Sequence, residues 1–185
     1  DTVLIGAEGD DEGGNHSGSA YVFIRSGLTW TQQAKLTAAD AQALDSFGMS
    51  VALSGGTALI GAYFEDEGGQ NAGAAYVFTR SGSSWTQQAK LLASDAAKED
   101  QFGFSVALDG DTALIGAPGN DDAGLQSGSV YVFTRSGTAW TQQGKLAASG
   151  TSAGDLFGCS LSLDNNLAVI GASMADTPLA DSGAV

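Results

Sequence analysis

The chain has 185 residues, of which 43% are hydrophobic, and its mean hydropathy is +0.01, as is typical of a folded protein rather than a disordered or membrane-embedded one. Its formal net charge of −14, from 21 acidic and 7 basic side chains, argues against nucleic acid and anionic lipid as partners, because both attract basic surfaces. No run approaches the roughly 18 apolar residues of a membrane-spanning helix, so we expect no membrane insertion.

The whole sequence is one 55-residue unit repeated. Phe-Gly pairs begin at Phe47, Phe102 and Phe157, and an apolar run ending in Gly-Ala follows each of them. Without gaps, 26 of the 55 positions are identical in all three copies. The copies are residues 1–55, 56–110 and 111–165, and residues 166–185 begin a fourth. A fixed period of this size indicates one supersecondary unit stacked many times, since a single unit cannot bury its own apolar face.

Each unit is predicted to hold four short antiparallel strands, because its runs are rich in β-branched and aromatic residues and are bounded by turn residues. In the third copy these strands are residues 102–108, 112–117, 129–135 and 140–146. Asp109-Gly110 between two apolar runs is a strong hairpin signal. Only residues 93–99 are compatible with a helical turn. The prediction is therefore an all-β fold.

Four antiparallel strands repeated at this length are typical of the blade of a β-propeller, whereas a β-solenoid uses shorter coils and parallel strands. Closure of the array is also favoured, because a lone four-stranded blade would expose two strand edges and two sheet faces. The predicted boundaries are a partial blade at 1–44, blades at 45–99 and 100–154, and a partial blade at 155–185.

The residues of the unit resemble a known family. Phe102-Gly103, followed by Ser105–Leu108 and by Leu114–Pro118, resembles the FG-GAP repeat, the blade signature of integrin α subunits and of many secreted or surface bacterial proteins. The stretches 127–133 and 140–143 resemble the bacterial variety of that repeat. The resemblance implies a seven-bladed ring, of which this chain holds about three and a third blades. We therefore expect either further blades from a longer parent chain or self-association of two copies.

The resemblance also implies calcium, held in some blades by a loop between the first two strands. Here that loop is too short for six ligands, as residues 108–112 show. Acidic residues gather instead between the second and third strands. They are Asp10, Asp11 and Glu12, then Glu65, Asp66 and Glu67, then Asn120, Asp121 and Asp122, with Asp176 in the partial copy. Adjacent carboxylates on a glycine-rich loop are candidate Ca²⁺ ligands. The alternatives are that the central Asp caps a turn, or that the loop is simply solvated.

Three other repeated features are expected to be structural. An Asp two residues before each Phe-Gly is expected to accept backbone N–H bonds at a turn. The Trp that opens the fourth strand is expected to pack between blades. The Thr-Gln-Gln-x-Lys sequence that follows it reads as a solvated sheet face. The residues are Asp45, Asp100 and Asp155, and Trp30, Trp85 and Trp140.

The repetition argues against catalysis, because an active site normally needs one asymmetric set of residues. Few chemically useful residues occur once, and His16 and Cys159 are far apart in sequence. Phosphate-binding loops and nucleophile motifs are absent from the sequence. We therefore expect no enzyme activity in this stretch.

The resemblance implies an extracellular or cell-surface recognition or adhesion scaffold that binds protein or glycan through loops at one rim. Two alternatives stay open. In the first, the chain is the propeller portion of a secreted enzyme, for example a polysaccharide-degrading one. In the second, it is a structural subunit of a surface fibre or layer.

Overall fold

The computed structural model describes residues 1–165, 167–176 and 182–185, and within them the chain forms thirteen strands and no helix. The strands are β1 (Thr2–Ala7), β2 (Ser19–Ser26), β3 (Thr29–Leu36), β4 (Ser50–Ser54), β5 (Thr57–Ala62), β6 (Ala74–Ser81), β7 (Ser84–Leu91), β8 (Ser105–Asp109), β9 (Thr112–Ala117), β10 (Ser129–Ser136), β11 (Ala139–Leu146), β12 (Phe157–Asp164) and β13 (Leu167–Ala172).

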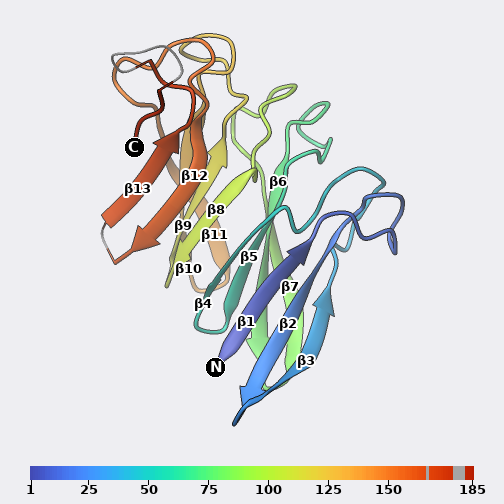
Figure 1. Ribbon diagram of the computed structural model, residues 1–185. Coiled ribbons are helices and arrows are strands. Elements are labelled where there is room, and N and C mark those ends of the chain that lie inside the picture. The colour runs from blue at the N-terminus through green and yellow to red at the C-terminus, as the bar shows by residue number, and fades with distance from the viewer. Residues whose placement is uncertain (166, 177–181) are drawn as a thin grey trace.

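Neighbouring strands pair antiparallel in four sheets, which follow one another in chain order. The first sheet is β1-β2-β3, the second β4-β5-β6-β7, the third β8-β9-β10-β11 and the fourth β12-β13. The sheets stand side by side in an arc, with β4 beside β8 and β8 beside β12 (Figure 1). The fold is therefore all-β and built of propeller blades, as the sequence predicts.

The local predictions agree closely with the strands of the third sheet. Asp109 pairs with Thr112 across a two-residue turn, as the Asp-Gly signal predicts, and β9 has the predicted bounds. The first strand begins at Ser105 rather than at Phe102, because residues 102–103 form a turn in which Phe102 donates its backbone N–H to Ala72, between β5 and β6 of the preceding sheet. Residues 93–99 form turns and not a helical turn.

The hydrophobic cores lie between sheets, not within them. One core joins side chains of the first and second sheets, one joins the second and third, and one joins the third and fourth. Alternate side chains of a strand enter opposite cores, so Leu59 packs toward the third sheet while Ile60 packs toward the first. Each sheet is therefore stabilised by its neighbours, as expected for stacked repeats.

The phenylalanine of the Phe-Gly pair anchors each core. Phe102 is fully buried, and its ring meets the edges of Tyr131 and Phe133 at centroid distances of 5.3 and 6.0 Å. Its backbone N–H donates to the carbonyl oxygen of Ala72, on the preceding sheet, at 2.8 Å. One residue thus fills its own sheet's face and binds the sheet before it.

The glycines of the repeat allow two backbones to touch. A Cβ atom on Gly61 of β5 would lie 1.9 Å from the carbonyl oxygen of Gly103, which belongs to the next sheet. The Ser50 hydroxyl donates to that same oxygen at 2.7 Å. The Gly-Ala and Phe-Gly parts of the signature are therefore the two sides of one contact between sheets.

The two ends of the sheets differ in loop length. Two-residue hairpin turns occupy one end, such as residues 55–56 and 82–83, and we call this end the hairpin rim. All the longer segments occupy the other end, which we call the loop rim, at the top of Figure 1. The loop rim consists of residues 8–18, 63–73 and 118–128 and of the connectors 37–49, 92–104 and 147–156.

Candidate functional site at the loop rim

The central Asp of each acidic loop caps a turn of that loop. One carboxylate oxygen accepts the backbone N–H five residues later, at 2.7 to 2.8 Å. That receiving residue has a positive φ of 54° to 55° in every copy, so the bond stabilises an unfavourable backbone conformation. The pairs are Asp11 with His16, Asp66 with Asn71, and Asp121 with Gln126.

The acidic residues on either side of the central Asp bind a lysine from the fourth strand of the same sheet. In the second sheet, the Lys90 ammonium group on β7 contacts Glu65 at 2.8 Å and Glu67 at 2.6 Å. In the first sheet, Lys35 bonds to Asp10 at 3.1 Å and also to Glu12. The acidic loop is therefore closed onto its own sheet.

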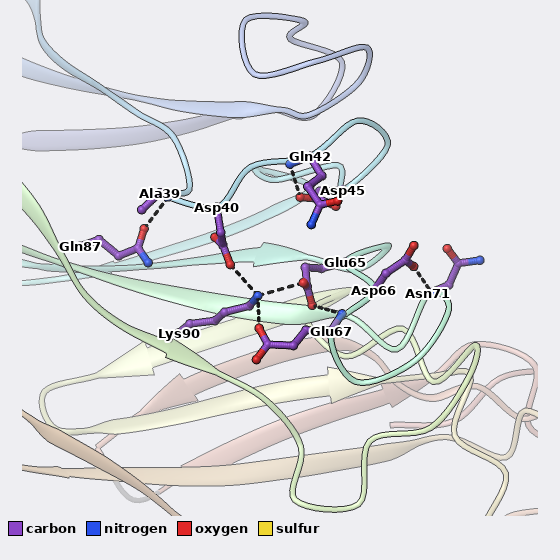
Figure 2. A network of polar contacts seen from close by, with 10 residues as sticks. All are labelled: Ala39, Asp40, Gln42, Asp45, Glu65, Asp66, Glu67, Asn71, Gln87 and Lys90. Atoms are coloured by element: carbon purple, nitrogen blue, oxygen red, sulfur yellow. Dashed lines mark hydrogen bonds and ion pairs between the residues drawn. The ribbon is translucent and has the colours of Figure 1, made fainter.

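The same lysine reaches across to the preceding connector. Lys90 contacts Asp40, which follows the first sheet, at 2.6 Å, so three carboxylates surround one ammonium group (Figure 2). Lys145 repeats the arrangement with Asp95 at 2.8 Å and Asp122 at 2.6 Å. In each case the lysine joins two sheets electrostatically.

Asn120 replaces the buried carboxylate in the third sheet. Its side-chain oxygen accepts the Ser129 hydroxyl at 2.9 Å and the backbone N–H of Asp122 at 3.4 Å. Lys145 therefore has two carboxylate partners where Lys90 has three.

The ion pairs hold these groups in their charged forms. The backbone N–H of Glu12, and then Lys35, lower the pKa of Asp10 from 3.8 to about 2. Burial opposes the charge of Asp40, but the Lys90 ammonium outweighs burial and lowers the pKa of that carboxyl group. Burial likewise opposes the charge of Lys90, yet its three carboxylate partners raise its pKa.

Some of the predicted calcium ligands lie close together, but a lysine lies among them. Oxygens of Asp40, Glu65 and Glu67 lie within 4.8 Å of one another, close enough to share a cation. The Lys90 ammonium group already bonds to all three, and Asp66 is directed to the backbone of Asn71 instead (Figure 2). These residues do not fit calcium while Lys90 remains among them. Calcium binding at the loops stays a prediction, and Lys90 would compete with it.

Asp176 is exposed and follows β13. The loop that would continue from it, residues 177–181, lies outside the described residues. The predicted role of Asp176 as a metal ligand therefore stays a prediction.

The Asp before each Phe-Gly caps the connector, as predicted. Its carboxylate accepts a backbone N–H three residues earlier: Asp45 from Gln42 at 2.7 Å, and Asp100 from Ala97 at 2.9 Å. Asp155 makes the same bond. Burial is the main reason that the pKa of Asp45 is raised from 3.8 to about 6.

The fourth strand carries polar bonds between sheets, which corrects the prediction of a solvated face. The indole N–H of Trp85 donates to Gln33 of the first sheet at 3.2 Å, and that of Trp140 donates to Gln88 of the second at 3.1 Å. Gln87 accepts the backbone N–H of Ala39 at 2.9 Å (Figure 2). In the second sheet, Gln87 and Gln88 thus bond to opposite neighbours.

The packing of the tryptophans follows from the same contacts. Trp85 and Trp140 pack against cores between sheets, as predicted. Trp30 lies on the outer face of the first sheet and is 45% exposed.

Sheets that share their cores with their neighbours, joined by repeated glycine, tryptophan and lysine contacts, define the chain as a β-propeller blade array. The FG-GAP repeat family matches residues 1–23, 30–78, 85–133 and 140–185, and the chain belongs to this family. No curated protein matches the sequence. Among the described residues, none lies in a helix of the length and apolarity that crossing a bilayer requires.

Proposed function

We propose that the chain is a recognition or adhesion scaffold that acts outside the cell and binds protein or glycan through its loop rim. The fold and the family support a scaffold role, because most repeated polar residues are engaged in holding sheets together. The rim is the surface on which the long loops of successive sheets meet. Binding residues commonly lie on loops that a rigid framework positions.

The observation that carries this proposal is where the copies differ. Although 26 of 55 positions are identical, 11 positions carry a different residue in each copy, and eight of these lie on the loop rim in every copy. The eight positions are Glu8, Tyr63 and Pro118; Asp10, Glu65 and Asn120; Asn15, Gln70 and Leu125; His16, Asn71 and Gln126; Thr37, Leu92 and Ala147; Gln42, Ala97 and Ser152; Leu44, Glu99 and Gly154; and Ser46, Gln101 and Leu156. Of the other three, two lie at the hairpin rim, at positions 28 and 29 of the unit, and the third is Met49, Phe104 and Cys159, of which Cys159 lies in β12. Variation concentrated on one surface of a constant framework is what repeat proteins use for binding.

Blocking one rim at a time tests the proposal. In a Cys159→Ser background, Gln70→Cys places a thiol on the loop rim and Ser83→Cys places one on the hairpin rim, both at exposed positions. Each variant is coupled to polyethylene glycol maleimide and applied to a panel of immobilised glycans and extracellular proteins. Coupling at residue 70 should abolish whatever binding the unlabelled protein shows, and coupling at residue 83 should not. The reverse pattern, or no binding to the panel, would contradict the proposal.

A second candidate function is assembly, and the outer face of the first sheet favours it. Val3, Ile5 and Trp30 are 37%, 49% and 45% exposed. Their counterparts in the second sheet, Ala58, Ile60 and Trp85, pack against the first sheet. We propose that a further blade of the same type covers this face, from a longer parent chain or from a second copy. Light scattering on the 18.5 kDa chain checks this, because a defined oligomer supports a second copy and a monomer excludes one.

A further inference from the structure

A pocket opens on the loop rim where the first and second sheets meet. It has a volume of about 330 Å³ and is open to solvent. One side is aromatic, formed by Tyr63 and Phe64, and the polar side includes Glu8, Asn15 and His16. The chain's single histidine thus lies beside two aromatic residues, at the join between two sheets.

The pocket is not a repeated feature of the array. At the next join, Asn71 and Glu99 occupy the positions of His16 and Leu44, and the Asn71 amide donates to the Glu99 carboxylate at 3.0 Å. Gly119 stands there in place of Phe64, where a Cβ atom would lie 2.0 Å from the Glu99 carbonyl oxygen. A hydrogen bond and close backbone packing therefore replace the aromatic wall.

The aromatic wall is held in place by further packing. The ring centroid of Tyr63 lies 3.8 Å from that of Phe64 and 5.5 Å from that of Phe104, which meets it edge-on. Burial, with a contribution from the nearby Glu8 carboxylate, raises the pKa of Tyr63, so its hydroxyl stays protonated and can donate a hydrogen bond. Aromatic rings held in this way offer apolar contact at little cost in conformational entropy.

The size and chemistry of the pocket indicate the class of ligand. A volume of this order suits a small molecule or one or two rings of a polymer, whereas a protein partner needs roughly 800 Å² of surface on each side. A sugar ring has an apolar C–H face for an aromatic wall and hydroxyl groups for carboxylate, amide and imidazole groups. The Glu8 carboxylate and the net charge of −14 disfavour acidic sugars. Glu8 is also exposed, so an ion pair with a basic side chain would gain little.

We infer that this pocket is a binding site for a neutral saccharide. The inference rests on the proposed recognition function and specifies it: the ligand is a glycan, Tyr63 and Phe64 contact its C–H face, and Glu8, Asn15 and His16 bind its hydroxyl groups.

The single histidine makes the test direct, because every imidazole signal in an NMR spectrum belongs to His16. Methyl glycosides of glucose, galactose, mannose and N-acetylglucosamine, and short neutral oligomers of each, are titrated to about 10 mM, where a site with a millimolar dissociation constant is mostly filled. At least one of these saccharides should shift the His16 signals until the shift reaches a plateau. Saturating the aromatic protons of the protein should also transfer saturation to the protons of that sugar.

Variants that copy the next join provide the matched comparison. His16→Asn with Leu44→Glu introduces the residues of a join that folds in this same chain, and it should weaken saccharide binding at least tenfold. Tyr63→Ala should do the same. For these variants the readout is saturation transfer to the sugar. Gln126→Asn, at the corresponding position of the third copy, should leave the affinity unchanged.

The outcomes separate this inference from the proposed function. If glycan binding on the panel is lost on labelling residue 70 but survives His16→Asn with Leu44→Glu, the rim binds glycan elsewhere and the pocket inference is wrong. If no saccharide moves the His16 signals while N-acetyl-arginine methylamide does, the pocket takes a basic side chain and the inference is again wrong.

Discussion

The join between the first and second sheets and the join between the second and third have equivalent interiors and different rims. Both interiors bury a Phe-Gly phenylalanine, tie a tryptophan to a glutamine, and link a lysine to an Asp on the preceding connector. At the rim, one join has an aromatic pocket and the other an Asn71–Glu99 hydrogen bond. The interior contacts fix the backbone, which leaves rim side chains free to differ without loss of the fold.

If the interior contacts carry the stability, the largest effect should come from the glycine contact between sheets. Gly61→Ala would place a methyl group 1.9 Å from a backbone oxygen, so we expect a loss above about 3 kcal/mol in the free energy of unfolding. Gly144→Ala is the control, because nothing lies within 4 Å of that position and its counterparts are Ala34 and Ala89. It should be neutral or stabilise by about 0.5 kcal/mol. Urea denaturation measures both, and equal losses would contradict the comparison.

The lysine clusters should come next, and they differ between joins. Lys90→Met leaves three carboxylates together, including the buried Glu65, so we expect a loss of about 3 kcal/mol. Lys145→Met leaves two, with the neutral Asn120 nearby, and should cost about half as much. Thermal unfolding with calcium and with chelator adds a sharper comparison. Calcium should stabilise Lys90→Met more than the wild type, and equal responses would show that Lys90 does not compete with a cation.

A buried carboxyl group in the connector should make stability depend on pH. Because folding raises the pKa of Asp45 from 3.8 to about 6, folding favours its protonated form, and its contribution to stability falls as the pH rises through this range. Asp45→Asn should therefore gain stability relative to wild type between pH 4 and pH 6, by about 1 to 2 kcal/mol after solvent screening, and level off above that range. Denaturation curves at several pH values measure the difference. Parallel profiles for the two proteins would count against a buried ionising group.

The smallest effect should separate an inner tryptophan from the outer one. Trp140→Phe removes the bond to Gln88, and a double-mutant cycle with Gln88→Leu should give a coupling of about 1 kcal/mol. The matched cycle, Trp30→Phe with Gln88→Leu, pairs residues that make no such bond in the structure and should give about zero. A coupling of similar size in both cycles would mean that the indole bond does not contribute to the join.

The features that can be predicted from the sequence are those that depend on residues adjacent in the chain. The Asp109-Gly110 hairpin, β9 and the Asp45 cap each follow from a few adjacent residues. The contacts between sheets join residues about 50 positions apart, such as Asp40 with Lys90, and singly each residue resembles an ordinary surface charge. The only sign of these contacts in the sequence is that the charged residues recur with the 55-residue period. The pocket could not be predicted in this way, because it is formed by residues that the copies do not share.

The family repeat is offset from the sheets, and this bears on how such chains grow. The match at residues 30–78 starts in β3 of one sheet and ends in β6 of the next, so it contains both sides of a join. Duplicating a repeat in this phase copies one strand of a sheet together with three strands of the next, and not a sheet with two uncovered faces. An array can therefore lengthen by whole repeats without evolving a new core, and each added copy brings rim positions at which a different specificity can arise.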